Sequence, residues 1–128
     1  MEVARTAEGL SLCQRKFILD LLSDTGMLAC KPSSVPMDQS VKLSSANGDD
    51  VPDAALYRGM VGKLFYLTLT RPDISYAIQK LRQFMKAPKM PHLQVDYKVL
   101  KYLKKTPGQG LFLSTHSELQ LKSYCDAN

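Results

Sequence analysis

The sequence predicts an α+β fold, in which a central helical bundle carries a β-hairpin at its N-terminal end and a pair of strands at its C-terminal end. Three observations support this prediction. Polar and apolar residues alternate at both ends of the chain, apolar residues recur at helical spacing in the middle, and a proline- and serine-rich stretch interrupts the helices. Because a lone strand pair is unstable in water, we expect both pairs to be truncated from larger sheets.

The first 30 residues predict a hairpin followed by a helix. Residues 2–5 and 10–13 alternate in polarity, and the stretch between them ends in glycine, as hairpin turns often do. Residues 15–25 carry an apolar stripe at helical spacing, and Gly26 is placed to end that helix in a left-handed conformation.

Residues 31–52 differ in composition from the segments on either side, because they include Pro32, Pro36, Pro52 and several serines. A loop of this length without regular structure is uncommon inside a compact domain. We therefore predict a flexible linker over 31–52, tethered by Val35 and Met37, that divides two subdomains.

Three helices are predicted after the linker. Residues 53–69 form the first, with an apolar stripe of Leu56, Met60, Val61, Leu64 and Leu67. Thr70 and Asp73 match a capping box that starts a helix over 72–86. The last, over 91–105, is expected to bury Leu93, Tyr97, Leu100 and Leu103, and strands at 110–113 and 119–124 follow it.

Composition favours a polyanion as partner. Lys and Arg exceed Asp and Glu by 17 to 12, a net charge of +5, although many proteins without such a partner are as basic.

The three cysteines are odd in number and widely spaced, so we expect reduced thiols. No apolar run approaches the ~20 residues of a membrane span and no signal peptide is recognisable. We expect a soluble, intracellular protein with no membrane partner, in the cytoplasm or the nucleus.

Two helix faces are candidate nucleic-acid sites. Lys98, Lys101 and Lys105 lie opposite the apolar face of the last helix, where they either follow a phosphate backbone or are simply solvated, the simpler interpretation. On the 53–69 helix, Arg58, Gly62 and Tyr66 share a side beside Lys63. A glycine inside a helix costs about 1 kcal/mol against alanine. We therefore expect another helix or a nucleic acid to approach Gly62 closely. His92 and His116 lie beside no nucleophile and are expected to be solvated surface residues.

Several blocks of the sequence resemble, in the same order, blocks of Ty1/copia-type LTR retrotransposon Pol polyproteins. They are QRKFILDLL at 14–22, CKP at 30–32, YRGMVGKLFYL at 57–67, TRPDI at 70–74, QFM at 83–85, LKYLKKTPG at 100–108 and SYCDA at 123–127. No single block is decisive, but their ordered succession is specific.

The resemblance implies a position near the C-terminal end of a reverse transcriptase. Residues 1–30 would be the end of the palm, with the primer-grip hairpin and a helix, and 31–52 the linker. Residues 53–108 would be thumb- and connection-like helices, and 109–128 the truncated start of a ribonuclease H-like domain. Arg58, Gly62, Lys63 and Tyr66 would then contact a primer–template duplex, and Asp126 would match the first metal-binding acid of ribonuclease H.

Departures from the family pattern imply that the chain is no enzyme. The family's Tyr-x-Asp-Asp polymerase turn does not occur in the sequence, and Asp126 alone cannot hold a two-metal centre. We expect no cofactor, because magnesium would bind only in the full-length enzyme with its upstream palm and downstream ribonuclease H segments. The expected residual role is non-specific binding of an RNA/DNA duplex. The alternatives are a helical protein-interaction module with no nucleic-acid role, and a chain that never folds stably.

Overall fold

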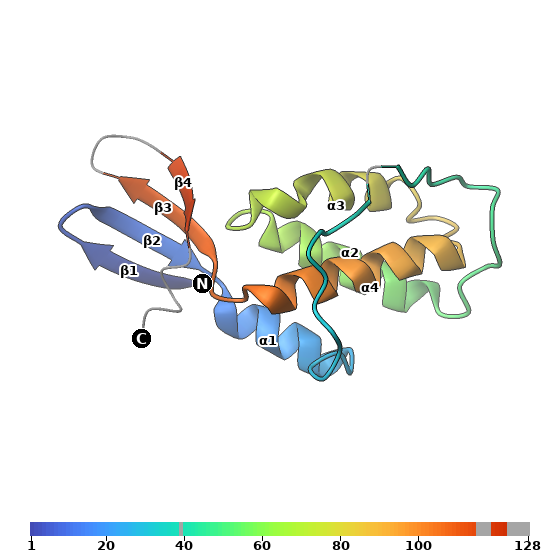
Figure 1. The fold of residues 1–128 in the computed structure, drawn as a ribbon. Coiled ribbons are helices and arrows are strands. Elements are labelled where there is room, and N and C mark those ends of the chain that lie inside the picture. Colours follow the sequence, from blue (N-terminus) through green and yellow to red (C-terminus); the bar gives the residue numbers. More distant parts are fainter. Residues whose placement is uncertain (39, 115–118, 123–128) are drawn as a thin grey trace.

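The computed structural model describes residues 1–38, 40–114 and 119–122 of the chain (Figure 1). Helices and strands occur wherever the periodicity predicted them, although the third helix is shorter than expected. The elements are β1 (Glu2–Thr6), β2 (Gly9–Cys13), α1 (Arg15–Asp24), α2 (Ala54–Leu67), the 3₁₀ turn η1 (Pro72–Ile74), α3 (Ser75–Arg82), α4 (Met90–Lys105), β3 (Gly110–Ser114) and β4 (Leu119–Lys122). Gly26, just after α1, has the left-handed φ of 71° that its position predicted.

The four strands form one antiparallel sheet in the order β1-β2-β3-β4, which stands to one side of the helices (Figure 1). The hairpin and the C-terminal pair therefore meet along β2 and β3, a pairing that the sequence analysis missed. Gly110 permits the close approach, because a Cβ at this position would lie 2.0 Å from the carbonyl oxygen of Leu12. All of β1 is exposed at the edge of the sheet. Truncation from larger sheets stays a prediction.

The hydrophobic core lies among the four helices, with α4 in contact with α1, α2 and α3. It includes side chains that are fully or almost fully buried on each helix: Ile18, Leu22, Val61, Leu64, Ile78, Leu81, Leu100 and Leu103. On α2 the predicted stripe is wrong at one end, because Leu56 is 41% exposed and Tyr57 is buried instead. The Tyr57 hydroxyl donates a hydrogen bond of 2.5 Å to the Leu81 carbonyl, which joins α2 to α3.

Over its described residues, 31–38 and 40–52, the segment predicted as a flexible linker contains no helix or strand, but it is held against the helices. It crosses α4 (Figure 1), where the Ser33 amide donates to the Lys101 carbonyl at 3.1 Å. Near its end the Met90 amide donates to the Asp49 carbonyl at 2.8 Å. Met37 is buried as expected, whereas Val35 is 45% exposed. The division into subdomains stays a prediction.

The cysteines differ from the expectation of reduced thiols. Cys13 at the end of β2 is disulfide-bonded, so the expectation is wrong for this residue, while Cys30 is free. Spacing in the sequence could not show this, because a disulfide depends on which segments the fold brings within reach of one another. Within the described residues, none of the helices has both the length and the apolarity that crossing a membrane requires.

Candidate nucleic-acid interface

One side of α2 carries small residues and has no packing partner within the described chain. The helix begins at Asp53, whose carboxylate accepts a hydrogen bond of 3.1 Å from the Leu56 amide and so caps the first turn. On the side opposite the core, Gly59 and Gly62 are exposed. A Cβ added at either glycine would have no atom of another element within 4 Å. Within the described residues, the partner expected at Gly62 is therefore not another helix of this chain.

The glycine surface is flanked by Arg58, Lys63 and Tyr66. The sequence predicted this grouping, because helical spacing places the three residues on neighbouring sides of one helix. The Arg58 side chain is partly engaged, since its Nε donates to the Met85 carbonyl at 2.8 Å and its Nη2 to the Lys86 carbonyl at 3.4 Å. Lys63 is exposed. Tyr66 is 42% exposed, and its ring lies 5.2 Å from the ring of Phe17 on α1, which steadies it. This surface combines open backbone, two cationic side chains and an aromatic ring.

Lys98, Lys101 and Lys105 are not part of the same surface. Their side of α4 faces away from the core that α4 shares with α2, so the two candidate faces point in different directions. The 31–52 segment also lies against this side of α4 through the Ser33–Lys101 hydrogen bond, and Lys98 and Lys101 are half-buried. Only Lys105 is exposed.

His92 was predicted to be a solvated surface residue, and this prediction is wrong. The side chain is fully buried, and its ring stacks on Phe84 with 3.8 Å between ring centroids. The Lys89 amide donates to Nδ1 at 2.9 Å, so a neutral ring carries its proton on Nε2 and donates to the Ser44 carbonyl at 3.0 Å. Burial lowers the pKa of His92, which favours this neutral form. Local sequence could not reveal this burial, because it depends on contacts with Phe84 and Ser44, which lie outside α4.

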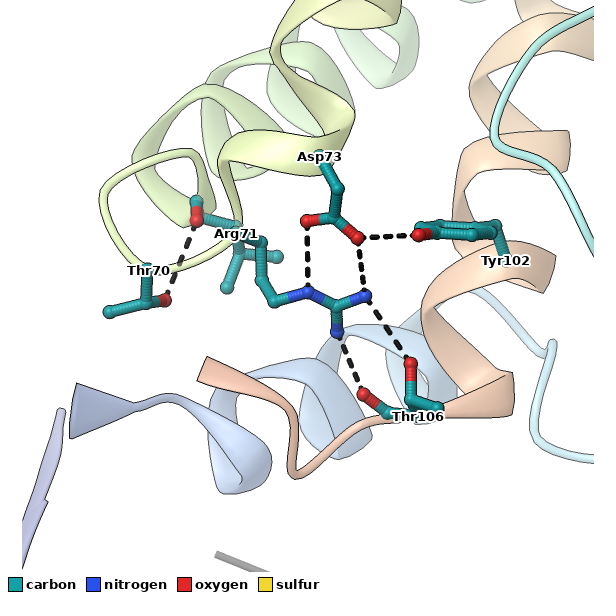
Figure 2. A network of polar contacts seen from close by, with 6 residues as sticks. Thr70, Arg71, Asp73, Tyr102 and Thr106 are labelled. Atoms are coloured by element: carbon teal, nitrogen blue, oxygen red, sulfur yellow. Dashed lines mark hydrogen bonds and ion pairs between the residues drawn. The ribbon is translucent and has the colours of Figure 1, made fainter. Parts of the chain in front are cut away.

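The turn between α2 and α3 is held by a buried polar network instead of the predicted capping box (Figure 2). The Asp73 carboxylate accepts two hydrogen bonds from the guanidinium of Arg71, at 3.1 and 2.9 Å, and one from the Tyr102 hydroxyl at 2.5 Å. Arg71 is fully buried, and its Nη1 also donates to the Thr106 carbonyl at 2.7 Å. The TRPD block therefore fastens the turn to the C-terminal end of α4, and a capping box at Thr70 and Asp73 is wrong.

The electrostatics of Asp73 follow from this network. Burial alone would raise the pKa of the Asp73 carboxyl, but the hydrogen bonds from Arg71 and Tyr102 and the charge on Arg71 outweigh it and hold that pKa below its usual value. Burial, together with the hydrogen bond to Asp73 and the charge of that carboxylate, raises the pKa of the Tyr102 hydroxyl, and Arg71 opposes this rise. These residues are structural, because their polar groups are satisfied by one another.

Asp96 is the charged residue that sequence reasoning missed. It is fully buried on α4, and neither carboxylate oxygen has a hydrogen-bond partner among the described residues. Burial raises the pKa of its carboxyl to about 8. The signal was present in the sequence, because Asp96 falls between Leu93 and Leu100 on the apolar side of its helix.

The predicted metal-binding residue, Asp126, lies outside the described residues, as does His116. Among residues 1–38, 40–114 and 119–122, no three His, Cys, Asp or Glu side chains converge to form a metal site. The interface on α2 therefore remains the best-defined candidate site in this part of the chain.

Comparison with known proteins finds close relatives in sequence, although no family model and no solved structure matches the chain. All 128 residues are similar to the retrovirus-related Pol polyproteins from transposons RE1 and RE2 of Arabidopsis thaliana, at 48% and 45% identity. A transposon Ty5-1 protein of Saccharomyces cerevisiae is 31% identical over 120 residues, which are 93% of the chain and 39% of that protein. The chain spans 9% of the length of each of the two Arabidopsis polyproteins.

Proposed function

The chain belongs to the family of retrovirus-related Pol polyproteins from transposons, and from that premise we propose that it binds a primer–template duplex through the exposed side of α2. One observation carries the proposal: Gly59 and Gly62 leave the backbone of α2 open, and no atom of another described element occupies the space. A helix without side chains on one side is able to lie close to the sugar-phosphate surface of a duplex.

The flanking side chains fit this role. Lys63 and the unengaged part of the Arg58 guanidinium would pair with phosphates on either side of the helix, and the half-exposed ring of Tyr66 would pack on a sugar. Contacts of this kind carry no sequence information, so binding would be non-specific and would weaken as salt displaces it. The lysines of α4 face elsewhere and take no part.

The resemblance of the sequence blocks supplies the place of each element in this proposal. The β1–β2 hairpin would be the primer grip, α2 the helix of a reverse transcriptase thumb, α3 and α4 the connection, and β3–β4 the start of a ribonuclease H-like domain. These 128 residues would supply binding and not catalysis, because they contain no Tyr-x-Asp-Asp turn. Adding magnesium, nucleotides and a primed template to the chain should therefore give no extension.

The test uses a substitution that changes the interface without disturbing the fold. Gly62→Ala adds a methyl group where no other element lies within 4 Å, so it should stabilise α2 by up to about 1 kcal/mol. The same methyl group should hold the duplex away and weaken binding about fivefold, the equivalent of roughly 1 kcal/mol. Fluorescence anisotropy with a labelled DNA–RNA hybrid in about 50 mM salt measures the affinity.

Lys63→Gln should also weaken binding and reduce its dependence on salt, whereas Lys31→Gln, at an exposed lysine that lies outside α2, serves as the matched control. No measurable affinity of the unaltered chain in low salt, or equal affinity for the unaltered chain and Gly62→Ala, would contradict the proposal.

A helical protein-interaction module is the second candidate function. One observation favours it: the edge of the same surface carries exposed apolar side chains, with Phe65 47% and Leu69 59% exposed. Charge reversal at Lys63, an exposed residue, discriminates between the two functions. It should abolish retention of nucleic acid if the duplex is the partner, and leave capture of a protein partner intact if it is not.

A further inference from the structure

A cavity lies between α3 and part of the 31–52 segment. The cavity has a volume of about 360 Å³, and Val41, Lys42, Tyr76, Lys80, Gln83 and Phe84 contribute to its walls. This volume falls in the range of sites that hold small organic ligands. Arg82, which reaches over the ring of Phe65 on α2 at 4.1 Å, projects from another side of α3.

The α3 wall of the cavity presents one side chain of each kind needed to hold a nucleotide. Tyr76, Lys80 and Gln83 follow one another at helical spacing and therefore share a side of the helix. Tyr76 is 50% exposed, and the Lys80 ammonium lies over one face of its ring, 5.5 Å from the centroid. A base that stacks on the other face of the ring would have its phosphate within reach of Lys80. Phe84 behind them is fixed by its stacking on the buried His92.

The charge of the cavity also selects an anionic occupant. Lys42 and Lys80 line it, and among the described residues no acidic side chain does. The two acids that line the adjoining cavity are already engaged: Asp73 by Arg71 and Tyr102, and Asp38 by the backbone and hydroxyl of Ser40. The cavity is thus positive, partly apolar and open to solvent at Tyr76.

We propose that this cavity is a binding site for single-stranded nucleic acid, in which one base stacks on Tyr76 and the adjoining phosphates pair with Lys80 and Lys42. Stacking on an exposed ring accepts any base, so the site would bind single strands without strong sequence preference. A base-paired duplex cannot enter, because its bases are already stacked on one another. This site is separate from the proposed duplex surface on α2, and either can exist without the other.

The chain contains no tryptophan, which makes a direct test available. The variant Tyr76→Trp keeps an aromatic face at the mouth of the cavity and provides a single indole fluorophore. Adding a short oligo(dT) in about 50 mM salt should quench this fluorescence, and the matching duplex should not. Unchanged fluorescence at concentrations of oligo(dT) that saturate binding would overturn the proposal.

Anisotropy with labelled oligo(dT) tests the same site independently. Tyr76→Ala should weaken binding of the single strand about tenfold, the loss expected for one stacked base, and Lys80→Gln should weaken it less. Lys31→Gln is the charge-matched control and should leave single-strand binding almost unchanged. Equal losses in the control and in Lys80→Gln, or competition by polyglutamate as effective as that by oligo(dT), would show attraction by charge alone and overturn the proposal. Circular dichroism of each variant confirms that the helices are retained.

Discussion

Replacing Asp96 with alanine is expected to stabilise the fold by roughly 4 kcal/mol near neutral pH. The carboxyl group is fully buried, and neither of its oxygens has a hydrogen-bond partner among the described residues. An apolar interior disfavours the charged form, so burial raises the pKa from 3.8 to about 8. Alanine is smaller than aspartate, but it favours a helix and brings no polar atom into the core, so most of this gain should remain.

The magnitude and its sign follow from the two pKa values. Between about pH 4 and pH 8 the folded protein keeps a proton on Asp96 that the unfolded chain has lost. The free energy of unfolding therefore falls as pH rises through this window, by 1.36 kcal/mol for each pH unit. At pH 7 the loss is roughly 4 kcal/mol, which is a large part of the 5–15 kcal/mol that stabilises a typical domain. Ionisation of this one side chain is therefore expected to weaken the fold as the pH rises.

The assay is urea unfolding followed by circular dichroism at about pH 5 and about pH 8. Between these values the free energy of unfolding should fall by roughly 3–4 kcal/mol in the unaltered chain, and this fall should vanish in Asp96→Ala. Asp96→Asn is the control, because it removes the ionisation but keeps a polar group in the core. If the unaltered chain and Asp96→Asn show the same change of stability with pH, the carboxyl is solvated and the reasoning is refuted.

Two further substitutions test the architecture. Arg71→Ala should lower the free energy of unfolding by about 3 kcal/mol, because it leaves the Asp73 carboxylate without its cationic partner and the Thr106 carbonyl without its donor; a loss below about 1 kcal/mol would contradict a buried, satisfied network. Gly110→Ala should separate β2 from β3, since its methyl group would lie 2.0 Å from the Leu12 carbonyl oxygen. Amide exchange should then quicken in the sheet but not in α2–α4, and Gly59→Ala, which meets no neighbour, should leave the sheet protected.

The positions of the helices and strands were predictable because each depends on local periodicity. Several of the contacts between these elements were not predictable. Leu56 and Tyr57 are both apolar, so the period alone could not decide which of them turns toward the core. The β2–β3 pairing joins residues about a hundred positions apart, and nothing local specifies it. The side chain of Asp73 was expected to bind the backbone of its own turn, but a buried arginine two residues earlier offered a stronger, bidentate partner.

Part of the candidate site could likewise be predicted from the sequence, and part of it could not. Arg58, Gly62, Lys63 and Tyr66 could be grouped from the sequence, because helical spacing alone places them on neighbouring sides of α2. Their separation from the lysines of α4 could not, since it depends on how the two helices pack. The engagement of Arg58 with the Met85 and Lys86 carbonyls was equally hidden, because it reaches a segment 27 residues away.

These contacts determine which substitutions are able to report on binding. Removing Arg58 would cut two hydrogen bonds that hold the end of α3, so a weaker duplex affinity in that variant would be ambiguous. Gly59 and Gly62 each cost α2 about 1 kcal/mol against alanine, and no other described element fills the space beside them. Their presence therefore gives the isolated fold no packing advantage. Gly62→Ala should move stability and affinity in opposite directions, a combination that partial unfolding cannot imitate.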